Sequence, residues 1–130
     1  MPPTGSPSDS NLPTVLIVDD HPTFRSFARD LLQSEGFDVV GEAEDGTSAL
    51  AAAGELRPEV VLLDVQLPDL SGFEVSQKLK ADGVEAVVVL VSSRSASDYG
   101  DLIETSGAAG FVPKAELSGD AVRSFLRGAA

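Results

Sequence analysis

Cysteine is missing from this chain of 130 residues, and histidine occurs only once. The lack of cysteine excludes a disulfide framework, a thiolate metal site and a cysteine nucleophile. Long apolar runs are missing too, because none approaches the ~18 residues that span a bilayer. The first residues have neither the basic start nor the apolar stretch of a secretory signal. We therefore expect a cytoplasmic protein that has no membrane partner.

Basic residues are scarce: nine Lys and Arg stand against 21 Asp and Glu, which gives a formal net charge of −12. Such a surface repels the phosphates of nucleic acids, and the basic residues form no cluster that would overcome the repulsion. The simplest role of the acidity is solubility. In either case we expect no direct binding of nucleic acid by this chain, so that any such role would need a partner.

The length and composition fit one soluble globular domain, with 42% hydrophobic and 23% charged residues. Residues 1–13 hold four of the eight prolines together with Gly, Ser and Asn, and they lack apolar periodicity. This composition predicts a disordered N-terminal tail at residues 1–13. One folded domain is expected over residues 14–128.

Short apolar runs alternate with segments of helical periodicity from Thr14 onward. The runs predict strands at residues 15–18, 37–42, 60–63, 86–91 and 111–112. Helices are predicted from Pro22 to Gly36, at 47–56, from the capping box at Ser71 to about Lys80, between 95 and 106, where only Leu102 and Ile103 offer an apolar face, and around Val122. This alternation predicts an α/β fold with a flavodoxin-like, doubly wound five-stranded parallel sheet, strand order 2-1-3-4-5, and five helices.

Polar residues follow four of these strands at the point where each strand ends. Asp19 and Asp20 follow the first strand, Asp64 the third, Ser92 the fourth and Lys114 the fifth. In the order 2-1-3-4-5 these four strands are neighbours, and ligands bind beyond the carboxyl ends of such strands. We therefore expect the five side chains to meet in one crevice.

Three carboxylates in one crevice repel each other, so they either hold a proton between them or bind a hard cation. An oxygen-only ligand set favours Mg²⁺ over zinc or copper. Beside a metal and a lysine, a carboxylate can attack a phosphoryl group and form an aspartyl phosphate. Lys114 would neutralise charge on the phosphoryl oxygens, and Ser92 could donate a hydrogen bond to one of them. His21, ahead of Pro22, is interpreted as a loop or cap residue.

Four motifs in this order resemble a response-regulator receiver domain of two-component signal transduction. They are Val15-Leu16-Ile17-Val18-Asp19-Asp20-His21-Pro22, Leu62-Leu63-Asp64-Val65-Gln66-Leu67-Pro68 with Gly72, Ser92, and Gly110-Phe111-Val112-Pro113-Lys114. The resemblance covers nearly all of residues 15–127. The Asp-His-Pro start, with Val40-Gly41-Glu42-Ala43 and Asp45-Gly46, is similar to the NarL/FixJ-like branch, whose members usually carry a helix-turn-helix output domain.

The resemblance implies a phosphoacceptor and a metal site. Asp64 would accept the phosphoryl group from a sensor histidine kinase or a small phosphodonor, and Lys114 would pair with that group. Asp20, Asp64 and the backbone carbonyl of Gln66 would bind Mg²⁺ directly, and Asp19 would act mainly through water.

The resemblance also implies a switch, with no enzyme activity beyond self-phosphotransfer and autodephosphorylation. Ser92 would move toward the phosphoryl group and Phe111 would turn inward behind it. The change would reach the helix 4–strand 5–helix 5 face as a two-state population shift. That face would control a downstream protein or effector domain in a phosphorelay that regulates transcription, and members of the family often dimerise on phosphorylation.

Two departures from the family's commonest pattern bear on these expectations. Ala115 follows Lys114 where proline is usual, often through a cis bond, and a cis bond before a non-proline residue costs roughly 2.5–4 kcal/mol. The effector domain expected of the branch does not follow Arg127. The chain is then either a stand-alone receiver or a fragment.

Other functions stay open beside the phosphotransfer switch. A degenerate receiver would bind its partner without phosphorylation. A Mg²⁺-dependent phosphatase would also use Asp64 as its nucleophile, although Gln66 stands where such enzymes generally have a second acid. Flavin or dinucleotide binding is disfavoured, because Asp19 and Asp20 occupy the turn where a phosphate cradle would need glycines.

Overall fold

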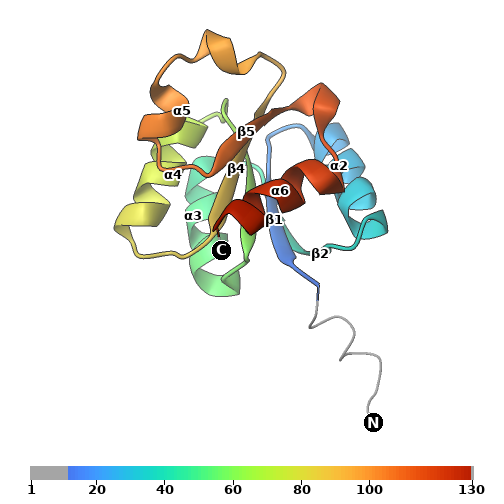
Figure 1. Ribbon diagram of the computed structural model, residues 1–130. Helices are drawn as coiled ribbons and strands as arrows, with labels where there is room; N and C mark the ends of the chain where they lie inside the picture. Colours follow the sequence, from blue (N-terminus) through green and yellow to red (C-terminus); the bar gives the residue numbers. More distant parts are fainter. Residues whose placement is uncertain (1–11, 130) are drawn as a thin grey trace.

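A five-stranded parallel sheet forms the centre of the computed structural model (Figure 1), in the order β2-β1-β3-β4-β5. The strands are β1 (Thr14–Val18), β2 (Asp38–Ala43), β3 (Val60–Asp64), β4 (Val87–Ser92) and β5 (Gly110–Pro113). The predicted strand order is confirmed. The structure describes residues 12–129, so residues 1–11 of the tail expected at 1–13 lie outside the described residues.

Helices cover both faces of the sheet (Figure 1), as a doubly wound fold requires. They are α2 (Pro22–Ser34), α3 (Gly46–Leu56), α4 (Gly72–Ala81), α5 (Leu102–Thr105) and α6 (Gly119–Ala129), with two short 3-10 turns, η1 (Ala96–Asp98) and η2 (Lys114–Glu116). Helices α3, α4 and α5 pack on one face, and α2 and α6 pack on the other. Within the described part of the chain, every helix is too short or too polar to cross a membrane.

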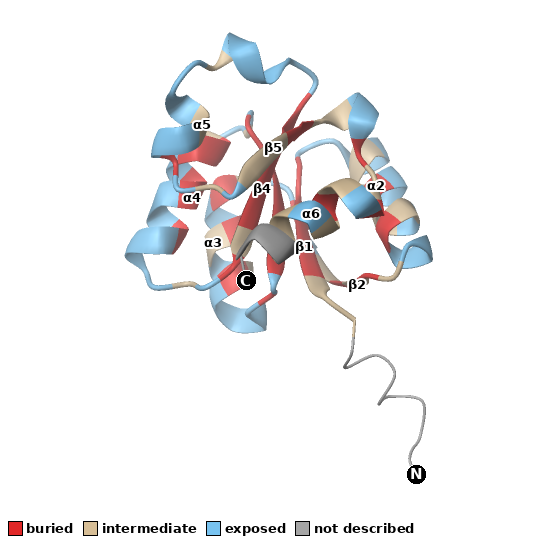
Figure 2. Ribbon diagram, in the orientation of Figure 1, coloured by how far each residue is buried: buried red, intermediate tan, exposed pale blue. Residues whose placement is uncertain are grey.

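The core consists of two apolar clusters separated by the sheet, which Figure 2 shows as buried strands between helices with exposed outer faces. Successive residues of a strand point to opposite faces. Leu16 and Val18 therefore pack toward α3 and α4, and Val15 and Ile17 pack toward α2 and α6. This two-sided burial explains why the central strands read as continuous apolar runs rather than as alternating ones.

The helix expected between residues 95 and 106 differs from the structure. It is broken into η1 and α5, and Gly100 lies between them in the left-handed conformation with φ +57°. The physical reason is a shortage of apolar contacts: Tyr99 and Ile103 pack on the core, but Leu102 is 50% exposed. A segment with so little buried area gains little from forming one regular helix.

The local signals for helix ends agree with the structure. Ser71 and Glu74 form the capping box of α4, since each side chain accepts a hydrogen bond from the other residue's backbone N–H. Pro22 lies in the first turn of α2, where a missing N–H is tolerated. The cap of α2 is His21, whose side chain makes no capping hydrogen bond and points elsewhere.

Candidate functional site

The polar residues that follow β1, β3, β4 and β5 lie at one edge of the sheet. In the strand register, Asp64 is opposite Val91, and the next residue, Ser92, is opposite Pro113, which precedes Lys114. The backbone N–H of Asp19 donates to the Ala43 carbonyl at the end of β2. The parallel strands thus end together, and their end residues become neighbours although they are far apart in the sequence.

Three aspartates and one histidine make up an acidic cluster at this edge. Asp19, Asp20, His21 and Asp64 each place one side-chain ligand atom within 4.8 Å of the others. Asp19 is fully buried and Asp64 is 4% exposed, whereas Asp20 faces solvent. The convergence of Asp19, Asp20 and Asp64 that the sequence predicted is therefore present.

Lys114 supplies the positive charge that faces these acids. Its Nζ lies 2.6 Å from Asp19 Oδ2 and 3.6 Å from Asp64 Oδ2. The same Nζ lies 4.5 Å from the centre of the Phe24 ring, a distance at which the ring face attracts the ammonium group. Among the described residues every peptide bond is trans, so Lys114 reaches the acids without a cis bond at Ala115.

The electrostatics of the cluster are unfavourable for three ionised carboxylates. Burial raises the pKa of Asp64 to about 6, and the charges of Asp19 and Asp20 act in the same direction. The Lys114 charge and a hydrogen bond from the Gln66 N–H lower the pKa but do not cancel the rise. Ordinarily the carboxyl group of Asp titrates near 3.8, so the site holds Asp64 at an energetic cost that a bound proton or cation would relieve.

The residues present fit a hard divalent cation. Three carboxylates face a single lysine, so negative charge remains in excess at the cluster. Within the described part of the chain, Asp19 Oδ2 contacts Lys114 but accepts no well-aligned hydrogen bond. Carboxylate oxygens at such distances are the ligands that Mg²⁺ takes in proteins.

The loop between β3 and α4 carries Gln66 and is held by Asp69. The Asp69 carboxylate accepts hydrogen bonds from the backbone N–H groups of Gly46 and Thr47 at 2.7 and 3.0 Å, and from the Thr47 hydroxyl at 2.7 Å. These bonds join the loop to the N-terminus of α3 and lower the pKa of Asp69 to about 2. Asp69 could not be identified from the sequence, because its partners lie 22 and 23 residues earlier in the chain.

Gly72 lets the end of this loop lie directly against the backbone of Asp64. A Cβ atom at Gly72 would be 2.4 Å from the Asp64 carbonyl oxygen, which is closer than atoms can approach. The Gly72 N–H donates to the Val65 carbonyl at 2.7 Å. A glycine is therefore required at this position for α4 to begin beside the candidate phosphoacceptor.

We expect Asp69→Ala to lower the melting temperature at pH 7 by a few degrees, because α3 would lose these bonds at its N-terminus. The pKa of Asp69 is depressed, so the contribution is present above about pH 3.8 and is lost as pH falls toward 2. Thermal unfolding followed by circular dichroism at pH 7 measures the effect. Asp30→Ala, at an exposed position of α2, is the control, and equal melting temperatures for the two variants would contradict the assignment.

Two further residues at this edge were not identified from the sequence as part of the site. The His21 ring lies with Nδ1 at 3.0 Å from both Asp19 Oδ1 and Asp20 Oδ1, so this cap residue also belongs to the acidic cluster. The Tyr99 hydroxyl lies 2.6 Å from Ser92 Oγ. The position of His21 directly after Asp19-Asp20 was the one available signal, whereas Tyr99 sits in a segment without clear periodicity.

Phe111 is half-buried in β5, on the same side of the sheet as Tyr99. The two ring centres are 5.8 Å apart, and the Tyr99 ring also meets Phe73 edge-on at 5.4 Å. Tyr99 contacts both Ser92 and Phe111, and so it links these two residues. The structure therefore brings Ser92, Tyr99 and Phe111 together in one connected group.

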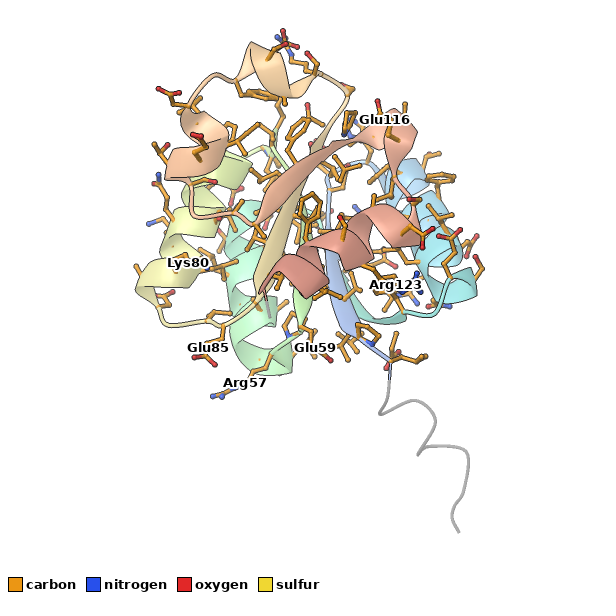
Figure 3. All side chains as sticks on the ribbon, viewed as in Figure 1. Arg57, Glu59, Lys80, Glu85, Glu116 and Arg123 are labelled. Carbon is orange, nitrogen blue, oxygen red and sulfur yellow. The ribbon has the colours of Figure 1, made fainter. Side chains whose placement is uncertain are left out.

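The opposite edge of the sheet carries a different set of charges. Arg57, Glu59 and Glu85, labelled in Figure 3, lie where β3 and β4 begin. A hollow of about 460 Å³ there is lined by Arg57 and Glu85 together with apolar atoms of α3. It lies at the far end of the sheet from the acidic cluster, so it takes no part in the candidate chemistry.

A family model described as the response regulator receiver domain matches residues 15–123. Among curated proteins, the virulence transcription regulator BvgA of Bordetella pertussis is 41% identical over 102 residues, covering 78% of this chain and 49% of BvgA. The nitrate/nitrite response regulator NarP of Escherichia coli is 40% identical over 119 residues, covering 88% and 55% of the two chains. The chain thus spans about half the length of the curated relatives it matches.

A solved structure shows the same fold. The signal receiver domain of the response regulator NarL from Mycobacterium tuberculosis superposes with a TM-score of 0.82 at 32% identity. The match covers 91% of this chain and 96% of that domain. Both the sequence relatives and this structure belong to regulators of the NarL type, as the sequence motifs indicated.

Proposed function

Because this chain belongs to the response regulator receiver domains of two-component signal transduction, we propose that Asp64 accepts a phosphoryl group and that the domain acts as a phosphorylation switch. The surroundings of Asp64 are the main support for this proposal. Asp64 is buried among Asp19, Asp20 and Lys114, with Lys114 Nζ 3.6 Å from Asp64 Oδ2. An isolated surface aspartate would have neither the raised pKa nor the cationic neighbour.

The Asp64 carboxylate has the properties of a nucleophile at neutral pH. With a pKa of about 6, it is mostly ionised at pH 7 and above, yet it remains more basic than an ordinary aspartate. A carboxylate oxygen would form the new bond to phosphorus while the bond between phosphorus and the donor's leaving group breaks. Lys114 stabilises the negative charge on the transferred oxygens, because its ammonium group already lies beside Asp64.

We assign the metal ligands from the resemblance to the receiver family, and the acidic cluster of Asp19, Asp20 and Asp64 supports the assignment. Asp20, Asp64 and the backbone carbonyl of Gln66 would hold Mg²⁺, and Asp19 would act mainly through water. When bound, Mg²⁺ lowers the repulsion between the acids and the incoming phosphoryl oxygens. Asp69 keeps the Gln66 loop in place through its bonds to α3.

The output surface of the proposed switch is formed by α5, β5 and α6. Ser92 would turn toward the phosphoryl group and Phe111 would follow, shifting the population of two arrangements of this face. The donor is a sensor histidine kinase or a small phosphodonor, and the target is an effector domain or a downstream protein, with a homodimer formed on phosphorylation. BvgA, a relative of about twice this length, is a transcription regulator, which supports such a target.

Incubation with Mg²⁺ and acetyl phosphate tests the proposal. We expect intact-protein mass spectrometry to show a gain of one phosphoryl group. We expect no gain when EDTA replaces Mg²⁺ in the incubation. No gain in the presence of Mg²⁺ would exclude the phosphotransfer switch and favour a receiver that works without phosphorylation. Turnover of p-nitrophenyl phosphate far above one equivalent would instead indicate the phosphatase.

A further inference from the structure

Ser92 is already engaged by another side chain in this structure. Its Oγ lies 2.6 Å from the Tyr99 hydroxyl and accepts a hydrogen bond from the Arg94 N–H at 3.0 Å. Ser92 is buried, with 2% of its surface exposed, so water does not compete readily for the same hydroxyl. Tyr99 is therefore the side chain that decides where the Ser92 hydroxyl points.

A serine hydroxyl has one proton and two acceptor lone pairs. If Ser92 donates to Tyr99, its only proton is used. If Tyr99 donates to Ser92, the Arg94 N–H and the Tyr99 hydroxyl occupy both acceptor positions and hold the Ser92 oxygen in place, while the Ser92 proton stays free. Under the first assignment, donation to a phosphoryl oxygen on Asp64 competes directly with the bond to Tyr99. Under the second, the Ser92 oxygen must leave the Tyr99 hydroxyl in order to move toward that oxygen.

The Tyr99 ring is placed to transmit the loss of this bond. It lies between Phe73 of α4 and Phe111 of β5, with ring centres 5.4 and 5.8 Å away. It also lines a groove of about 740 Å³ formed by the β3–α4 loop, α4 and Leu102 at the start of α5, which is half exposed. A change at Ser92 would therefore reach both Phe111 and the surface near α5.

We propose that Tyr99 is a positioning residue that holds Ser92 away from the phosphoryl group, and that phosphorylation of Asp64 breaks the Ser92–Tyr99 hydrogen bond and releases the Tyr99 ring from its place between Phe73 and Phe111. This inference rests on Asp64 being the phosphoacceptor. The bond is neutral and short, so it is strong enough to bias Ser92 and weak enough for a charged phosphoryl oxygen to replace it.

The rate of phosphorylation tests the restraint on Ser92. Tyr99→Phe keeps the ring contacts but removes the hydroxyl, so we expect phosphorylation by acetyl phosphate to be about two- to tenfold faster than in the wild type, the effect of one neutral hydrogen bond. Ser92→Ala is the matched background, since it lacks the group that Tyr99 restrains. In that background Tyr99→Phe is expected to leave the rate unchanged. An unchanged rate in the single variant, or an equal acceleration in both backgrounds, would overturn the proposal.

Fluorescence tests the release of the ring, because Tyr99 is the only tyrosine and the chain has no tryptophan. Beryllofluoride with Mg²⁺ mimics a phosphoryl group on aspartate. We expect it to increase quenching of the Tyr99 emission by acrylamide at least twofold, and to have no effect in Asp64→Asn. In Ser92→Ala the quenching is expected to be high before beryllofluoride is added.

The two measurements separate this inference from the proposed function. A mass gain on Asp64 with unchanged acrylamide quenching would overturn the role of Tyr99 and leave phosphorylation standing. Absence of the mass gain would contradict the proposed function. It would also contradict the role of Tyr99 in phosphorylation, because there would be no rate to compare. Circular dichroism of Tyr99→Phe and Ser92→Ala at the assay temperature verifies that both variants are folded when the rates are compared.

Discussion

Asp64→Asn is expected to gain no phosphoryl group from acetyl phosphate while being more stable than the wild type in metal-free buffer at pH 7 to 8. The first effect follows because an amide is not a nucleophile toward phosphorus. The second follows because the substitution removes a buried charge that faces Asp19 and Asp20. A variant that was merely misfolded would lose phosphorylation and stability together.

The pH dependence of the stability difference has a definite sign. The pKa of Asp64 is raised from 3.8 to about 6 in the folded state, so the folded protein binds the proton more tightly than the unfolded chain. The wild type is therefore penalised above pH 6, and the penalty disappears as pH falls toward 4. We expect an advantage for Asp64→Asn of about 1–2 kcal/mol at pH 7.5, discounted from the full shift because solvent reaches Asp20.

Urea unfolding at pH 7.5 and pH 4.5 in EDTA measures this difference, and mass spectrometry of the same samples measures phosphorylation. Asp30→Asn, at an exposed position of α2 outside the acidic cluster, is the control that changes an acid without changing the site. Phosphorylation that survives in Asp64→Asn would move the phosphoacceptor to another residue. A variant less stable than the wild type at pH 7.5 would show that the aspartates do not repel each other as the geometry requires.

Mg²⁺ is expected to stabilise the wild-type protein, and Asp20→Asn is expected to remove most of that effect. At 100 times the dissociation constant, a ligand bound only by the folded state adds about 2.7 kcal/mol to the free energy of unfolding. For a domain of this size that corresponds to a rise in melting temperature of roughly 10 °C. Asp20 is the exposed one of the three aspartates, so its replacement weakens ion binding without opening the core.

Melting curves recorded over a Mg²⁺ titration check this expectation. Glu44→Gln is a matched control, because Glu44 is an exposed acid just after β2 and lies outside the acidic cluster. This control is expected to keep the full Mg²⁺ response. A Mg²⁺ response in Asp20→Asn as large as that of the control would mean that the ion binds elsewhere on this acidic surface.

Much of the fold could be predicted because its signals are local. Buried parallel strands produce continuous apolar runs such as Val15 to Val18, and caps such as Ser71 with Glu74 depend on residues three positions apart. The secondary structure of the segment after β4 was harder to predict. It buries few side chains, and its division into η1 and α5 depends on which of them reach the core, which no short window of sequence contains.

The candidate site was predictable in part for a related reason. Parallel strands end at one edge, so acids that follow buried runs must become neighbours there, and Asp19, Asp20 and Asp64 did. The supporting residues were not predictable. The Asp69 carboxylate accepts hydrogen bonds from α3 residues that lie 22 and 23 positions earlier in the chain. The Tyr99 hydroxyl contacts Ser92 from a segment that has no helical periodicity. Such contacts depend on loop paths, and a loop path is set by the packing of the elements that it connects.

The alternation of strands and helices, the excess of acidic charge and the residue types at the strand ends all follow from the amino-acid sequence alone, because each depends on neighbours along the chain. Three pairings became visible only in the folded molecule: Lys114 lies closer to Asp19 than to Asp64, His21 contacts the acids, and Tyr99 contacts Ser92. These pairings depend on rotamers and loop paths, which are chosen when buried polar groups must find partners inside a packed core.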